Sequence, residues 1–260
     1  MLSKSRLVLL CLVAALACPA GIAYGQPAAQ EERVAASFVL ALGRAPSAAE
    51  LAGWTKQNPL SFADLITRHR DQLRADAAGA RAVAARAGYD AFGRAPSGEE
   101  LAGLAGGDIY AEVMKRHIQW LGGHPADYEQ VLNRAYRLLL RRDAYSIEVE
   151  YWRRQSVLPF ALVVACVDDW ARRNQPGLMA TAGAAAVSIN SAYLSTVRLS
   201  PAVAAEARMA AGLGRSADAE RAAAIGRTVI APGAEEVASV GGIFFAAAGS
   251  ARLRPEPEQR

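Results

Sequence analysis

Residues 42–54 read LGRAPSAAELAGW, and this stretch decides the fold because it recurs along the chain. Residues 92–104 read FGRAPSGEELAGL, and residues 140–152 read LRRDAYSIEVEYW, a more divergent third copy. The copies start 50 and 48 residues apart. Self-similarity at a fixed period is the sequence signature of a repeat architecture.

A second block supports the same period. FADLITRH at residues 62–69 returns as YAEVMKRH at residues 110–117, and FALVV at residues 160–164 takes the same place after the third copy. Two collinear blocks are poorly explained by chance, so the sequence predicts a tandem repeat.

Each copy is expected to form three helices joined by short turns. Val34, Phe38 and Leu42 recur at the spacing of one helix face. Gly43 follows directly and suits the left-handed residue that ends many helices. On the short helix after it, Trp54 is expected to face the core.

Pairs of residues three apart predict where the later helices begin. Ser47 and Glu50 fit a capping box, in which each side chain binds a free backbone N–H of the other residue. Ser97 and Glu100 repeat the pair, and residues 61–64 offer a similar start to the third helix of the first copy.

The turn of the third copy is expected to differ from the other two. Arg141 stands where the first copy has Gly43, and Ala144 stands where it has Pro46. Glycine and proline are the residues with special backbone preferences at such turns.

The sequence therefore predicts an all-α protein of tandem three-helix units stacked side by side, since one short unit cannot bury its apolar face alone. The expected units are residues 26–80, a degenerate unit at 81–125, and 126–175. Residues 176–260 are rich in alanine and glycine, and we expect them to be partly helical with a disordered end. A faint eight-residue period leaves a β-rich repeat and a low-complexity linker both open there.

The first 25 residues have the three-part pattern of a secretory signal peptide. Lys4 and Arg6 precede an apolar run, and Ala23-Tyr24-Gly25 predicts cleavage before Gln26. Lipidation at Cys18 is the alternative. Either route predicts an exported protein, periplasmic or extracellular, which contacts a membrane only through the signal peptide or that lipid.

Charge and cysteine content exclude further classes. The chain carries 29 Lys and Arg against 25 Asp and Glu, and a net charge of +4 does not indicate a nucleic-acid partner. Of three cysteines only Cys166 would remain after cleavage before Gln26, so no intramolecular disulfide is possible. Its apolar surroundings in the sequence predict a buried, inert thiol.

An aromatic residue four places before Leu-Gly-Arg-x-Pro, then Glu-Leu-x-x-Trp, resembles the bacterial domain of unknown function 4214. The resemblance covers roughly residues 31–175, although Gly88 replaces the aromatic residue in the second copy. It implies a helical module of exported and surface proteins, similar in shape to the phycobilisome linker domain, and it implies no activity or cofactor. The motif residues are Leu42, Gly43, Arg44, Pro46, Ser47, Glu50, Leu51 and Trp54 in the first copy, Gly93, Arg94, Pro96, Ser97, Glu100 and Leu101 in the second, and Tyr136, Leu140, Arg142, Glu148 and Trp152 in the third.

The recurring charged residues favour structure over chemistry. The arginines at 44, 94 and 142 recur with the glutamates at 50, 100 and 148, which predicts an ion pair in each copy rather than a row of ligand-binding arginines. His69 and His117 recur without the further ligands that a metal site needs. No catalytic, cofactor-binding or metal-binding residue is predicted, and Asp168-Asp169 is read as a solvated helix face.

These observations predict a non-catalytic interaction or structural module. Its expected partner is an envelope or extracellular protein, a polysaccharide, or a second copy of itself. Two alternatives remain open: an enzyme acting on envelope polysaccharide, and a helical protein with a ligand pocket between units.

Overall fold

The fold is all-α in the part of the chain that the computed structural model describes. That part comprises residues 26–57, 60–102, 106–154 and 157–174, with Arg198–Leu199, Val203, Glu206 and Ala238–Ser239. The predicted signal peptide, Cys18 and most of residues 176–260 lie outside the described residues.

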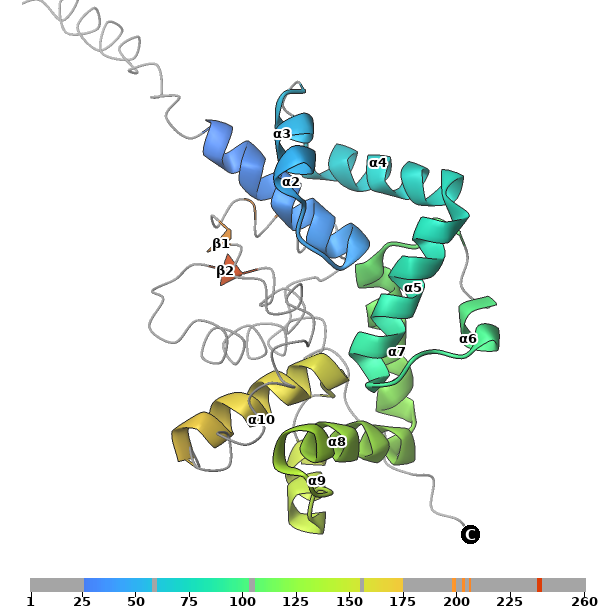
Figure 1. Cartoon of the computed structure of the whole chain (residues 1–260), viewed down its shortest axis with the longest axis vertical. Helices are drawn as coiled ribbons and strands as arrows, with labels where there is room; N and C mark the ends of the chain where they lie inside the picture. Colours follow the sequence, from blue (N-terminus) through green and yellow to red (C-terminus); the bar gives the residue numbers. More distant parts are fainter. Residues whose placement is uncertain are drawn as a thin grey trace, which may run out of the picture.

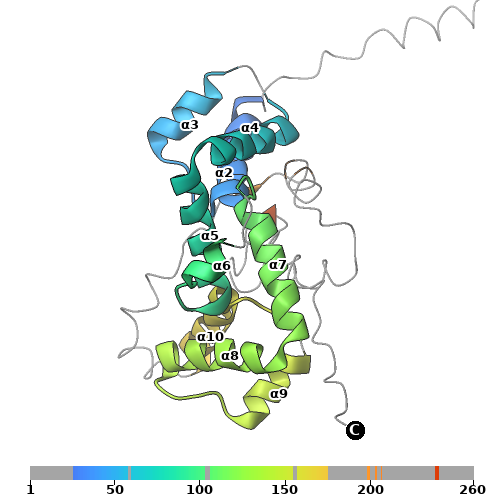
Figure 2. The same cartoon turned by 90° about the vertical axis from the view of Figure 1, so that its right-hand side faces the viewer.

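The described helices form three groups in the order long, short, long, and the groups follow one another along the longest axis of the molecule (Figure 1 and Figure 2). At one end lie α2 (Gln26–Leu42), α3 (Ala48–Thr55) and α4 (Phe62–Ala75). Next come α5 (Ala77–Phe92), α6 (Gly98–Ala102) and α7 (Tyr110–Gly123), and then α8 (Pro125–Leu140), α9 (Ser146–Arg154) and α10 (Phe160–Asn174). A two-residue antiparallel pair joins β1 (Arg198–Leu199) to β2 (Ala238–Ser239).

Helix starts and ends follow the predicted caps. Ser47 and Glu50 form a reciprocal capping box at the start of α3, and a second box starts α4 at Ser61. Gly43 and Gly93 end α2 and α5 in the left-handed conformation, with φ of +65° and +68°. These local predictions are confirmed. The cap residues stabilise the helices because they satisfy backbone groups that a helix end leaves free.

The prediction that the third turn differs is wrong at Arg141 and holds at Ala144, whose backbone N–H donates to Asn133 at 3.0 Å where proline has no N–H. Arg141 takes the left-handed conformation with φ of 59° and ψ of 23°, nearly the same as Gly93. Its backbone N–H donates to the carbonyl of Arg137, as that of Gly93 donates to Tyr89. The backbone geometry is therefore kept without glycine, at the steric cost that a side chain brings to this conformation.

Long helices supply most of the core. Contacts are most extensive between α5 and α7, between α8 and α10, and between α2 and α4. One apolar cluster runs through all of these helices, and a smaller one of Val34, Phe38 and Leu65 lies between α2 and α4. Leu51 and Trp54 of α3 pack against the smaller cluster while staying partly exposed. The short helix α3 therefore covers the core without entering it.

Two described residues from the Ala/Gly-rich region pack against the helices. Val203 is fully buried in the main apolar cluster. Glu206 accepts two hydrogen bonds from Arg33 of α2, at 2.9 and 3.0 Å. The sequence analysis treated this region as a separate tail and did not anticipate these contacts.

Candidate functional site

The same arginine–glutamate pair follows three of the long helices. Arg44 donates to both oxygens of Glu50 at 2.8 and 2.7 Å, and Arg94 donates to both oxygens of Glu100 at 2.8 and 2.5 Å. Arg142 binds Glu148 in the same two-pronged way at 2.6 and 2.8 Å. The predicted ion pairs are thus formed, and they occupy the N–H groups with which these arginines would bind an anionic ligand.

Each glutamate also accepts a hydrogen bond from the backbone N–H at the start of the next helix. The donors are Ser47, Ser97 and Tyr145, at 2.8, 2.6 and 2.7 Å. The arginine and this N–H lower the pKa of Glu50 and of Glu100 to about 2, and they lower the pKa of Glu148 as well. These carboxylates therefore stay ionised at neutral pH.

An aromatic ring lies beneath each guanidinium group. Arg44 lies 5.5 Å from the ring centre of Phe38, and Arg142 lies 5.3 Å from that of Tyr136. In the middle group Gly88 leaves no ring, and Phe92 takes the role with Arg94 at 5.6 Å. Sequence analysis missed Phe92, although its place one helical turn after residue 88 on the same face was a usable signal.

The other motif residues are structural. Trp152 is buried and donates its indole N–H to the hydroxyl of Tyr136 at 3.1 Å. Pro96 lies against Gly88, where a methyl group would come within 3.2 Å of the proline ring. Pro46, Leu101 and Leu140 are partly buried at their turns and helix ends.

Successive helix groups meet at two similar junctions. At the first, a Cβ atom on Gly43 would lie only 2.5 Å from the ring of Tyr110, the first residue of α7. At the second, a Cβ atom on Gly93 would lie 2.5 Å from the ring of Phe160, the first residue of α10. Close packing therefore requires glycine at both positions, and the positive φ favours it as well.

An arginine spans each junction. Arg86 of α5 donates to the carbonyl of Gly43 at 2.7 Å, and Arg134 of α8 donates to the carbonyl of Phe92 at 2.9 Å. Each guanidinium thereby satisfies a carbonyl at the C-terminal end of a helix in the preceding group, where a positive charge is favoured by the helix dipole.

A pocket opens beside each junction. The first pocket, of about 730 Å³, lies between α2, α3, α4 and α5. It is lined by Phe38, Leu42, Arg44, Glu50, Trp54, Gln72, Leu73, Ala75, Asp76, Gly79, Ala82, Val83 and Arg86. The second pocket, of about 510 Å³, is lined by Phe92, Arg94, Glu100, Arg116, His117, Trp120, Asp127, Gln130 and Arg134. Volumes of this size suit a small ligand.

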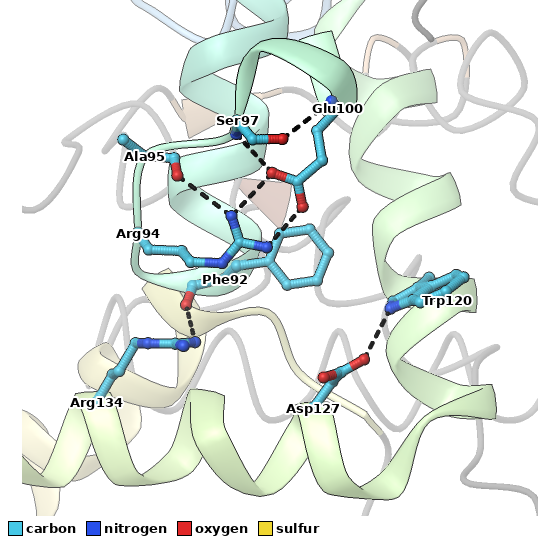
Figure 3. A network of polar contacts seen from close by, with 8 residues as sticks. All are labelled: Phe92, Arg94, Ala95, Ser97, Glu100, Trp120, Asp127 and Arg134. Atoms are coloured by element: carbon cyan, nitrogen blue, oxygen red, sulfur yellow. Dashed lines mark hydrogen bonds and ion pairs between the residues drawn. The ribbon is translucent and has the colours of Figure 1, made fainter.

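The second pocket carries an exposed aromatic side chain beside a carboxylate. Half of Trp120 is exposed, and its indole N–H donates to Asp127 at 3.2 Å. The ring stacks on His124, with centroids 3.5 Å apart and planes 12° apart. Figure 3 shows Trp120 and Asp127 across the pocket from the Arg94–Glu100 pair, with Arg134 below Phe92.

The recurring histidines lie beside the two junctions and are held neutral. His69 is buried between Phe38 and Trp54, stacking on the indole with ring centroids 4.6 Å apart. Its Nε2 lies 3.1 Å from the oxygen of Ser37, whose hydroxyl donates to the carbonyl of Val34 at 2.8 Å. The serine proton is thus used, which assigns the imidazole proton to Nε2. Burial lowers the pKa of His69 to about 4.

His117 takes the matching place in the second pocket. Its ring lies edge-on to Phe92, with centroids 4.9 Å apart, and burial lowers its pKa to about 4. Its buried Nε2 has no hydrogen-bond partner among the described residues. Two neutral imidazoles on separate helices do not form a proton-transfer pair.

The remaining predicted features carry no site. Cys166 is partly exposed rather than buried, because it lies at the edge of the apolar face of α10. Asp168 is partly exposed on the same helix, and the side chain of Asp169 lies outside the description. Within the described residues, no three His, Cys, Asp or Glu side chains gather where a metal ion could bind. Among those residues, no helix has both the length and the apolar character that a membrane span requires.

Comparison with known proteins gives no relative: no family model, no curated protein and no solved structure matches the chain.

Proposed function

We propose that this chain is an exported, non-catalytic interaction module made of three stacked copies of a three-helix unit. The units would be residues 26–80, 81–125 and 126–175, after a signal peptide over residues 1–25. The partner would be an envelope or extracellular protein, a polysaccharide, or a second copy of the chain. The resemblance to the domain of unknown function 4214 supports export, and it rests on the motif residues alone.

Recurrence of the junction contacts is the observation that carries the stacking. Gly43 and Tyr110 are 67 residues apart in the chain, and so are Gly93 and Phe160. Each contact joins the turn after the first helix of one group to the start of the last helix of the next group. The spanning arginines at 86 and 134 recur 48 residues apart. Equal spacings at equal contacts are what copies of one unit would produce.

The proposed lack of catalysis is supported by the protonation state of the recurring glutamates. An enzyme that cleaves polysaccharide commonly needs one carboxyl group with a raised pKa to act as the acid. The glutamates at 50, 100 and 148 have lowered pKa values instead, because each is held by an arginine and a backbone N–H. Their geometry stabilises turns and leaves them unsuited to donating a proton. Polysaccharide binding is the second candidate, favoured by the exposed Trp120 in a pocket.

The test is cross-linking of the tagged full-length chain in the native envelope fraction, followed by mass spectrometry of the products. We expect a mature protein that starts at Gln26 or at an acylated Cys18, joined to one recurrent partner. Excess untagged chain should suppress that product. A chain retained in the cytoplasm, or new reducing ends released from envelope polysaccharide, would contradict the proposal.

A further inference from the structure

The two pockets share an ion pair and a spanning arginine and differ in their other lining side chains. Aligning the helices at the spacings above places the ion pair and the spanning arginine of each pocket at equivalent positions, so these residues serve the packing in both. At three of the other lining positions the second pocket has the larger polar or aromatic side chain. The substitutions from first to second pocket are Gln72 to Trp120, Gly79 to Asp127, and Ala82 to Gln130.

These added side chains have the chemistry of a saccharide site. A sugar ring packs its C–H face on an aromatic ring, and its hydroxyl groups pair with planar polar side chains. Trp120 supplies the aromatic face, held in place by His124 behind it and by the bond to Asp127. Gln130 is exposed and lines the same pocket.

The charge of the pocket selects among sugars. Three arginines and two carboxylates line it. The Arg94–Glu100 pair is already closed, and Arg116 is paired with Asp108 at 2.6 Å, which leaves Arg134. A guanidinium has five N–H groups. The described contacts of Arg134 use one of its nitrogens, Nη1, on the carbonyl of Phe92, and they include no carboxylate. Asp127 acts on Arg134 through its charge and forms no hydrogen bond with it. A partly buried guanidinium to which no carboxylate is hydrogen-bonded favours an anionic ligand.

We propose that the second pocket binds an acidic saccharide, with a sugar ring on Trp120 and its carboxylate on Arg134. This inference rests on the proposed binding function and names a ligand class and a site for it. The first pocket has an indole and a carboxylate of its own, Trp54 and Asp76, but Gln72 stands where the second pocket has Trp120, so it is not expected to bind the same ligand.

The experiment is a calorimetric titration of the full chain with tetragalacturonate at low salt. We expect saturable binding with one site, and maltotetraose, a neutral oligosaccharide of equal length, should bind at least about tenfold more weakly. Inorganic phosphate at about ten times the ligand concentration should not displace it, since phosphate lacks the ring. Equal affinity for the neutral oligosaccharide, or displacement by phosphate, would overturn the proposal.

Matched variants locate the site. Trp120→Ala and Arg134→Gln should each weaken binding by about tenfold or more. Trp170→Ala removes a comparably exposed tryptophan from α10, and Arg86→Gln removes the equivalent spanning arginine of the first junction. Both controls should bind as the parent does. Loss of binding in either control, or its retention in both pocket variants, would reject the assignment.

A measurement on the parent protein does not depend on whether the variants fold. The indole N–H signal of Trp120 should shift in proton–nitrogen spectra on titration, while that of the buried Trp152 stays in place. An unmoved Trp120 signal at saturation would overturn the site. If tetragalacturonate fails to bind while cross-linking still yields an envelope partner, only the ligand inference falls. A chain retained in the cytoplasm would instead count against the wider proposal.

Discussion

Single backbone positions set the turns after the long helices. Arg141 holds a left-handed conformation that Gly43 and Gly93 hold at lower steric cost. Arg141→Gly should therefore raise the free energy of unfolding by about 0.5–1 kcal/mol. Urea unfolding measures it, and an unchanged midpoint would mean that Arg141 is not strained.

Gly43→Ala should have the opposite effect. The added methyl group would meet the ring of Tyr110 at 2.5 Å on a backbone with positive φ, so we expect a loss of more than about 1 kcal/mol. Gly53→Ala is the matched control, because nothing lies within 4 Å of its would-be Cβ atom and the residue is helical. There the same change should be neutral or stabilising. Equal losses at both sites would contradict the junction packing.

The buried histidines predict a pH dependence with a definite sign. In the folded chain His69 and His117 have pKa values of about 4, below the unfolded value of 6.5. Between these values only the unfolded chain binds the proton, so stability is present above pH 6.5 and is lost as the pH falls. Going from pH 7 to pH 5 should cost about 1–2 kcal/mol for each histidine.

Phenylalanine at both positions supplies the control. It keeps an aromatic ring beside Trp54 and Phe92 and removes the titrating group, while Ser37 still donates to Val34. Urea unfolding of the double variant at pH 7 and pH 5 should therefore show most of the acid-induced loss abolished. The glutamates at 50 and 100, with pKa values near 2, contribute only below about pH 4.5. A parent-like slope in the double variant would exclude the histidines as the cause.

Sequence reasoning succeeded best at this scale. Capping boxes, left-handed glycines and arginine–glutamate pairs are set by residues a few places apart, so local chemistry determines them. The prediction for Arg141 failed because glycine is preferred in the left-handed conformation without being required there. Phe92 was missed because its ring replaces one that the motif places a full helical turn earlier.

At the scale of elements, the short helices differ in how much they bury. Trp152 of α9 is 7% exposed, whereas Trp54 of α3 is only partly buried and α3 has no buried residue. The expectation that Trp54 faces the core therefore holds only in part. Trp152→Ala should cost about 3–5 kcal/mol, and Trp54→Ala about half of that. Thermal and urea unfolding compare the two, and a larger loss at Trp54 would contradict this order.

The middle short helix keeps the turn and the ion pair of its copy of the motif. The copy at residues 92–104 matches the first closely, and α6 begins at Gly98, where the first copy has Ala48. Glycine weakens a helix because it loses more backbone entropy on folding. The similarity of sequence nevertheless preserved the bonds between Arg94 and Glu100.

At the scale of the whole molecule, the sequence predicted helices but not the surfaces between them. The second pocket combines Arg94, Trp120 and Arg134, which lie on three segments and belong to no shared motif. Spacing alone cannot say which helices meet, since that depends on packing of long-range partners. The recurrence of arginine at 86 and 134 did indicate contacts between helix groups, but it can be interpreted only once the junctions are known.

The contact between Arg33 and Glu206 joins α2 to a residue 173 positions later in the chain. Both side chains are partly buried, with exposed fractions of 25% and 32%, and Arg33 donates to both carboxylate oxygens. Glu206→Gln should therefore lower the free energy of unfolding by about 1–2 kcal/mol and speed hydrogen exchange in α2. Glu150→Gln, which breaks an exposed pair with Arg154 within α9, should cost less than about 0.5 kcal/mol. Because Val203 lies in the buried core, Glu206→Gln should also make α2 more sensitive to protease. Hydrogen exchange in α2 as slow as in the parent would mean that Val203 and Glu206 add nothing to the stability of the helices.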